Sequence, residues 1–268
     1  MFLHSTILLL LIYLVEGRSI LWRSAAVNPC ISHCGESSSK LNVQTGLNNL
    51  GHTCFMNSVI QSLFTAEPYR KLVLESKFAE HSSGEELQRL FHKMSKCQRA
   101  SVSPHSLAKT LGISVNIQQD AEELFLQLIN NVDESTVGGG VFPSRAIQIN
   151  TLQQIDCINI PFSKKKAQKA LDLSLEVRGH SGILEALRSH FKPDLLVDNS
   201  GSDGGGMQYR TPEHGMQDAI KRLSILSASS SDQSAHDDLL PKVIVFHLKR
   251  FQYDHAAGVS SKVGGLHK

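Results

Sequence analysis

The chain has 268 residues and a mass of 29.5 kDa, which suits one large domain or two small ones. Hydrophobic residues make up 41% and charged residues 19%, a balance that supports a packed core and excludes a chain disordered throughout. Lys and Arg number 27 and Asp and Glu 25, so the net charge of +2 gives no footprint for nucleic acid. The three consecutive lysines at 164–166 are typical of a solvated face.

The chain begins with an apolar run at residues 7–15. A membrane-spanning helix needs about 20 residues, so this run is too short to span a bilayer. It matches the hydrophobic part of a signal peptide, with Val15 and Gly17 placed for cleavage. We predict a signal-like or anchor segment at 1–17, with membrane contact only if it anchors the chain, and a variable lead-in at 18–44. A wrongly assigned start and a buried helix are the alternatives.

Apolar periodicity predicts three helices in the first half of the chain, at residues 55–64, 85–95 and 121–132. Pro68 is expected to end the first of them. Asp120 is placed to cap the third, with Glu123 three residues later as in a capping box.

After the glycines at 138–140 the pattern changes to β-like segments, with one further helix. Helices first and strands later predict an α+β protein. The expected strands lie at 147–160, 171–177 and 243–251, the helix at 183–191, and two low-complexity loops at 198–206 and 227–238.

Five cysteines stand at positions 30, 34, 54, 97 and 157, and an odd number cannot pair completely. At least one thiol is therefore expected to be free. Cys30, His33 and Cys34 form a short cluster, but no second cysteine pair follows at a zinc-binding spacing. We predict neither a metal nor a cofactor.

The sequence around Cys54 carries the chemistry. A loop bounded by Gly46 and Gly51 delivers Cys54 to the first turn of a helix, where backbone N–H groups and the helix dipole favour a thiolate. A thiolate is a nucleophile for covalent catalysis, and Asn49 can offer an amide N–H to the oxyanion that such an attack creates. The alternative is that Cys54, beside Phe55, is a small buried hydrophobe.

Three motifs carry a resemblance to a known family. GLNNLGHTCFMNSVIQSLF, at 46–64, closely resembles the cysteine box of ubiquitin-specific proteases. Residues 118–124 are similar to the family's Gln-Gln-Asp-Ala-x-Glu-Phe box, and residues 240–251 resemble its Leu-Pro…His-Leu-Lys-Arg-Phe strand. The segments 157–161 and 213–219 look most like the herpesvirus-associated ubiquitin-specific protease branch.

The resemblance implies a papain-like cysteine protease fold shaped as a hand with thumb, palm and fingers. It implies a deubiquitinase that hydrolyses the bond after the C-terminal glycine of ubiquitin, with ubiquitin and ubiquitinated proteins as partners. Cys54 matches the nucleophile and Asn49 the oxyanion-hole side chain. Gln119 and Asp120 match positions that hold the arginine-containing ubiquitin tail, and for Asp120 a pure N-cap role is the alternative. His52 replaces the usual Asn and is given no role.

His247 is not chosen as the general base, because it lies in the motif strand. The family's catalytic histidine stands further downstream, in a Gly-His-Tyr context that this sequence does not contain. We therefore expect residues 45–268 to be the N-terminal part of a catalytic domain truncated at its C-terminus, inactive in turnover as given. Its strand 243–251 should end on an unpaired edge. The alternative is a catalytically incomplete ubiquitin-binding module.

Two further expectations come from the family. Many members bind zinc through cysteine pairs in the fingers, but residues 207–218 contain no cysteine, which again predicts no metal. Members mostly work in cytosol and nucleus, whereas residues 1–17 favour the secretory pathway or a membrane. The sequence therefore leaves the localisation open.

Overall fold

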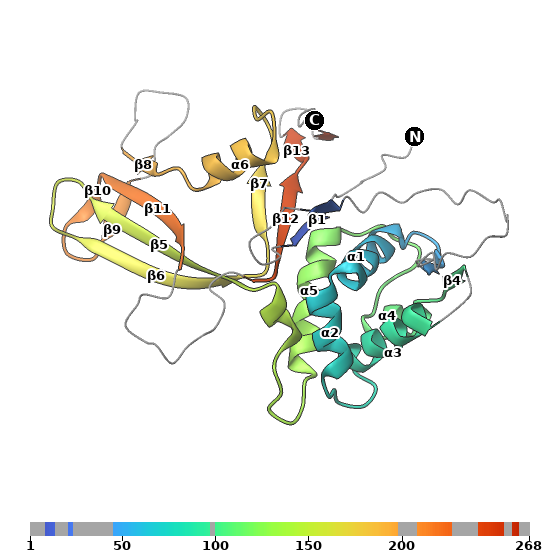
Figure 1. The fold of residues 1–268 in the computed structure, drawn as a ribbon. Coiled ribbons are helices and arrows are strands. Elements are labelled where there is room, and N and C mark those ends of the chain that lie inside the picture. Colours follow the sequence, from blue (N-terminus) through green and yellow to red (C-terminus); the bar gives the residue numbers. More distant parts are fainter. Residues whose placement is uncertain are drawn as a thin grey trace. The chain divides into compact units, whose positions relative to one another are not determined.

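Helices and strands are segregated along the chain. The computed structural model describes residues 9–13, 21–23, 45–96, 100–197, 208–226, 241–254 and 259–262. The chain divides into two units, of which the first comprises residues 1–147 with 241–247 and the second residues 148–240 with 248–268. Helices predominate in the first unit and strands in the second (Figure 1), so the predicted α+β class is confirmed.

The first unit contains all three helices predicted for this half of the chain, and two more. Pro68 does not end the first helix, which stops at Thr65, but stands in the first turn of the next one, where its missing N–H costs nothing. The helices are α1 (Cys54–Thr65), α2 (Glu67–Glu75), α3 (Ser83–Lys96), α4 (His105–Thr110) and α5 (Ala121–Glu134), followed by the 3-10 turn η1 (Pro143–Ala146).

The apolar faces of these helices form one core. Helix α1 packs against α2 and α5, and α3 packs against α2, α4 and α5. The rings of Phe64 and Phe91 meet edge to face with centroids 5.4 Å apart, joining α1 to α3. The residues within these helices that have no exposed surface are Met56, Val59, Ile60, Tyr69, Val73, Leu87, Phe91, Leu128, Ile129 and Val132.

Short strands complete the first unit. Strand β3 (Gly46–Leu47) pairs in parallel with β4 (Ser101–Val102) just before the loop that leads to Cys54. Strand β1 (Leu9–Tyr13) pairs antiparallel with β12 (Val243–Lys249), with Leu9 opposite His247, and β2 (Leu21–Arg23) pairs with β1.

Two expectations about the strand at 243–251 change. The sequence predicted an unpaired edge for this strand, and that prediction is wrong for Val243–His247. The apolar N-terminal run supplies strand β1, which pairs with β12 there. The expected single strand 243–251 is also interrupted at Arg250, after which β13 (Phe251–Asp254) pairs with β14 (Val259–Lys262). None of the helices described is long and apolar enough to cross a bilayer.

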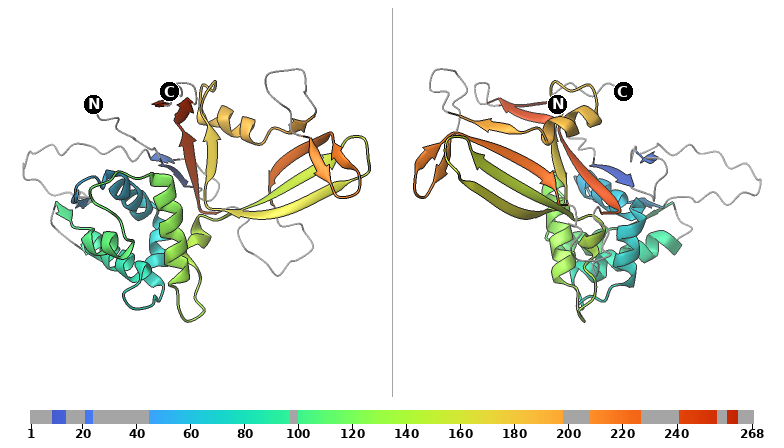
Figure 2. Two further views of the ribbon diagram at one scale, coloured as in Figure 1. Left: turned by 180° about the vertical axis from the view of Figure 1, so that it is seen from behind. Right: turned by 60° about the vertical axis from the view of Figure 1, so that its left-hand side comes forward.

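The second unit is built on the long strand β5 (Ile149–Cys157). It lies between β6 (Ser163–Ala170) and β11 (Ala219–Ile225), and β8 (Asp194–Leu196) pairs with the other side of β11 (Figure 2). The three lysines at 164–166 are exposed on β6, which confirms the solvated face. The unit also holds β7 (Leu173–Glu176), α6 (Ile183–His190) and the hairpin of β9 (Tyr209–Thr211) with β10 (Gly215–Gln217).

The helical core contains a fully buried tyrosine. Tyr69 in α2 has no exposed surface, and its hydroxyl finds no hydrogen-bond partner among the residues described. Burial, and secondly the charge of Asp133, raise the pKa of Tyr69 well above its ordinary value. A buried hydroxyl without a partner lowers the free energy of unfolding by its desolvation cost, because no hydrogen bond offsets it.

We predict that Tyr69→Phe leaves the free energy of unfolding unchanged or raises it by up to about 2 kcal/mol, because it removes this hydroxyl without opening a cavity. Tyr69→Ala is the contrasting variant and should lose about 3–5 kcal/mol through the cavity it leaves. Urea denaturation of the chain measures both. A clear loss of stability in Tyr69→Phe would show that the hydroxyl is hydrogen-bonded after all.

Candidate active site

Cys54 is the first residue of α1, and its side chain is exposed as a free thiol. The next two side chains, Phe55 and Met56, are 4% and 0% exposed. The helix thus turns its apolar face into the core and leaves its N-terminal residue at the surface. The interpretation of Cys54 as a small buried hydrophobe is therefore wrong.

The loop before Cys54 is pressed against the backbone at Val115. Gly51 has a φ of 143°, and a Cβ at this position would lie 2.5 Å from the carbonyl oxygen of Val115. The N–H of His52 donates to that same oxygen at 2.7 Å. Only glycine permits this close approach, and the contact fixes the loop two residues before the N-cap Thr53.

Two carboxamide side chains of α1 hold the other end of the loop. Asn57 donates from Nδ2 to the carbonyl oxygen of Asn48 at 3.1 Å, and Gln61 donates from Nε2 to that of Thr45 at 2.9 Å. Asn57 and Gln61 stand four residues apart and therefore share one face of the helix. Sequence reasoning gave neither residue a role, although their spacing in the motif was visible.

The carboxamide of Asn49 is oriented by its own loop. Its Oδ1 accepts from the Thr53 hydroxyl at 2.9 Å and from the N–H groups of Thr53 and Gly51 at 3.3 Å each. Nδ2 is the other arm of the carboxamide, and the residue is exposed. This places an amide donor, with its acceptor end already bound, in the loop that presents Cys54.

Gln119 and Asp120 precede helix α5, and both are exposed. Oδ1 of Asp120 accepts from the N–H groups of Glu122 at 2.7 Å and Glu123 at 3.2 Å, so the predicted N-cap is confirmed. This cap uses one carboxylate oxygen and does not exclude a second role for the other. The segment leading to it starts at Val115, where the Cys54 loop is held.

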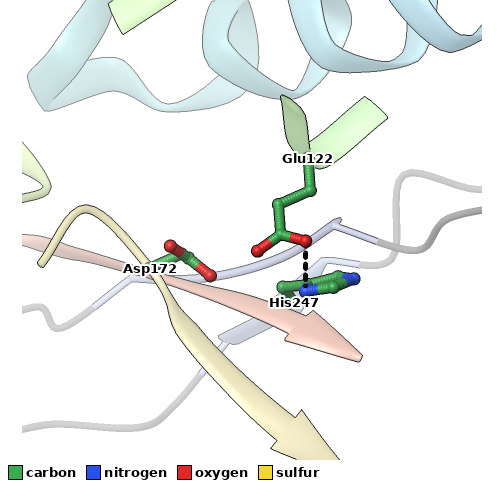
Figure 3. A group of neighbouring side chains, drawn as sticks. All are labelled: Glu122, Asp172 and His247. Carbon is green, nitrogen blue, oxygen red and sulfur yellow. Dashed lines mark ion pairs between the residues drawn. The ribbon is translucent and has the colours of Figure 1, made fainter. Parts of the chain in front are cut away.

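Glu122 connects the start of α5 to strand β12. Its Oε2 lies 2.8 Å from Nδ1 of His247 (Figure 3), and the two side chains are 27% and 14% exposed. Within the first unit, Glu122 thus joins the Gln-Gln-Asp segment to His247, and α5 packs against the helix that begins at Cys54. The sequence gave no sign of this pair beyond the presence of one histidine in an apolar strand.

Of the remaining cysteines, the structure describes only Cys157. Cys157 is a half-buried free thiol in β5. Cys30, Cys34 and Cys97 lie outside the residues described, as does His33, so the expectation of no zinc stays a prediction.

Comparison with known proteins shows the family of the chain. Residues 45–265 match the family model described as ubiquitin carboxyl-terminal hydrolase. The chain therefore belongs to the ubiquitin carboxyl-terminal hydrolase family.

Similar proteins carry names of the same kind. The chain is 26% identical to ubiquitin C-terminal hydrolase 12 of Arabidopsis thaliana, with 94% of this chain and 22% of that protein covered. It is 28% identical to ubiquitin carboxyl-terminal hydrolase 15 of Schizosaccharomyces pombe, with 87% and 20% covered. It is 26% identical to ubiquitin carboxyl-terminal hydrolase 7 of Drosophila melanogaster, with 81% and 18% covered. The chain thus spans about a fifth of the length of these curated relatives.

The contact at Val115 generates a stability prediction. Gly51→Ala should lower the free energy of unfolding by about 1–3 kcal/mol more than Gly112→Ala does, measured by urea denaturation. Gly112 is the matched control, because its φ of 68° is also positive but an added Cβ meets nothing within 4 Å. Equal losses in the two variants would mean that the loop does not approach Val115 closely.

Proposed function

We propose that this chain carries the catalytic cysteine of a deubiquitinase, with Cys54 as the nucleophile. The observation that supports this most directly is an exposed thiol on the first residue of a helix whose apolar face is buried, in a member of the ubiquitin carboxyl-terminal hydrolase family. A module that only binds ubiquitin has no need of a thiol in this position. The reaction is hydrolysis of the bond after the C-terminal glycine of ubiquitin.

The chemistry follows from the groups around Cys54. The thiolate attacks the carbonyl carbon of the terminal glycine, and the carbonyl oxygen becomes an oxyanion that the Nδ2–H of Asn49 stabilises. Collapse of this intermediate forms a thioester and releases the amine, and water then hydrolyses the thioester. Both later steps need an acid–base group. We assign only the nucleophile and the oxyanion donor to residues of this chain.

Gln119 and Asp120 are proposed to hold the ubiquitin tail. Both are exposed, and a carboxylate is the natural partner for arginine because the two form charge-assisted hydrogen bonds. In this proposal Asp120 has two roles at once, with Oδ1 capping α5 and the carboxylate charge attracting the tail.

The finer classification is also part of this proposal. We propose a papain-like hand, with helices α1 to α5 as the thumb and the strands of the second unit contributing to the fingers and palm. The segments 157–161 and 213–219 support a place near the herpesvirus-associated branch of the ubiquitin-specific proteases.

Covalent labelling tests the nucleophile. Ubiquitin carrying an electrophile in place of its C-terminal carboxylate should form one adduct with the chain, and Cys54→Ala should abolish it while the fold, followed by circular dichroism, is unchanged. Cys157→Ser, the matched control at the other described thiol, should label as the parent chain does. Labelling that survives Cys54→Ala and disappears in Cys157→Ser would overturn the assignment.

The double role of Asp120 can be separated by substitution. Asn caps a helix as well as Asp does, so Asp120→Asn should keep the free energy of unfolding within about 0.5 kcal/mol while weakening ubiquitin binding roughly tenfold through loss of the charge. Asp120→Ala removes cap and charge together and should also lower stability by about 1 kcal/mol. Calorimetric titration with ubiquitin and urea denaturation measure the two effects. Unchanged affinity in Asp120→Asn would leave only the capping role.

A further inference from the structure

We infer that Thr53 is a positioning residue for the Cys54 chemistry, because its buried hydroxyl sets which end of the Asn49 carboxamide is free. This inference rests on the proposed function, and it adds a residue to which the sequence assigned no role. Thr53 immediately precedes Cys54 and has no exposed surface, although its side chain is polar.

The Thr53 hydroxyl is committed in both directions. Its single proton is donated to Oδ1 of Asn49 at 2.9 Å, and its oxygen accepts from the N–H of Leu50 at 3.0 Å. A hydroxyl with its proton and a lone pair both engaged cannot rotate without breaking a hydrogen bond. The Leu50 N–H, which belongs to the backbone of the same loop, therefore fixes the direction in which Thr53 donates.

This donation determines the orientation of Asn49. An asparagine side chain can turn by half a revolution and exchange its acceptor Oδ1 for its donor Nδ2. The hydroxyl of Thr53 and the backbone N–H groups of Thr53 and Gly51 all offer protons to one point, which only Oδ1 can accept. Turning the amide would place N–H against N–H, so Nδ2 is kept as the free donor.

The alternative is that Thr53 is an ordinary helix cap. It occupies the N-cap position of α1, where threonine usually accepts a hydrogen bond from the first turn. Among the residues described, its side chain makes no such cap and instead turns back towards the loop. The residue thus forgoes the role that its position favours, which supports a function in the loop rather than in the helix.

A transfer reaction that needs no acid–base group tests this directly. Ubiquitin joined at its C-terminal glycine to a small alkyl thiol is a thioester, and attack by Cys54 passes through an oxyanion and expels a thiolate. The thiolate leaves without a proton, so the new thioester at Cys54, followed by mass spectrometry, reports attack and oxyanion binding alone. Alkylation of Cys54 by iodoacetamide forms no oxyanion and serves as the control reaction.

Thr53→Val keeps the shape of the side chain and removes the hydroxyl, whereas Thr53→Ser keeps the hydroxyl. We expect Thr53→Val to slow ubiquitin transfer roughly 10- to 100-fold, less than the 10²–10³-fold typical of removing an oxyanion donor outright. Thr53→Ser should restore transfer to within about threefold of the parent chain, and iodoacetamide should react equally with all variants. If Thr53→Val does not fold, Thr53→Ala carries the same comparison.

A double-mutant cycle separates positioning from a general structural effect. If Thr53 acts through Asn49, Thr53→Val should cause no further loss in an Asn49→Ala background. Additive losses, or a Thr53→Val chain that transfers ubiquitin as fast as its parent, would overturn the inference while leaving the proposed function intact. A parent chain that accepts no ubiquitin from the thioester would overturn the proposed function and this inference together.

Discussion

Helix α1 must bury its apolar face and yet present its first residue, Cys54, to solvent. The proposed site depends on meeting both requirements, with the helix fixed by packing and the loop before it fixed by hydrogen bonds. Met56, Val59 and Ile60 have no exposed surface, so the helix is fixed by apolar packing. The loop before it carries Asn49 and Gly51 on the surface and cannot be fixed in that way. It is held by hydrogen bonds that Thr53, Asn57 and Gln61 donate to it and by one that it donates to the carbonyl oxygen of Val115, and each has a direction.

Hydrogen bonds and ion pairs also connect the segments that contain the three motifs. The carbonyl oxygen of Val115, which accepts from the Cys54 loop, lies five residues before Asp120, the N-cap of α5. In the first turn of α5, Glu122 bonds His247. A displacement of α5 would therefore disturb the contact of the loop with Val115 and the contact of Glu122 with His247. Among these side chains Glu122 bonds a remote segment, whereas Asn49, Thr53, Asn57 and Asp120 bond groups of their own segment.

The sequence predicted what depends on periodicity. Helices α1, α3 and α5 are long and amphipathic, and all three were found, whereas α2 and the six-residue α4 were missed because Pro68 was read as a terminator and a short helix has too few turns to show a period. Strand β1 lies in a uniformly apolar run, which a signal peptide shows equally well. Strand β6 contains Lys164–Lys166, whose uniform polarity hides the alternation of a strand.

For the proposed site, the motif suggests Cys54, Asn49 and Asp120 but does not show which contacts hold them. Spacing along a chain shows which residues share a helix face, whereas the pairing of Glu122 with His247 depends on where two remote segments come together. The backward turn of Thr53 was hidden for a different reason, since threonine before a helix normally predicts a cap. Thr53, which we propose to orient Asn49, is therefore a residue for which the local sequence rule points to another role.

Substitutions in the loop before Cys54 and in the apolar core are expected to change different properties, because hydrogen bonds orient the loop and packing stabilises the core. A net hydrogen bond is worth only about 1 kcal/mol, so losing one loop contact removes little of a domain's stability. It does free a side chain to turn, and an oxyanion donor that points the wrong way for most of the time contributes little to the reaction. In the core the larger effect is on stability, because a cavity at Leu87 or Phe91 costs several kcal/mol. Substitutions of the side chains that hydrogen-bond the loop are therefore expected to change mainly the reaction rate. Substitutions in the core are expected to change mainly the free energy of unfolding.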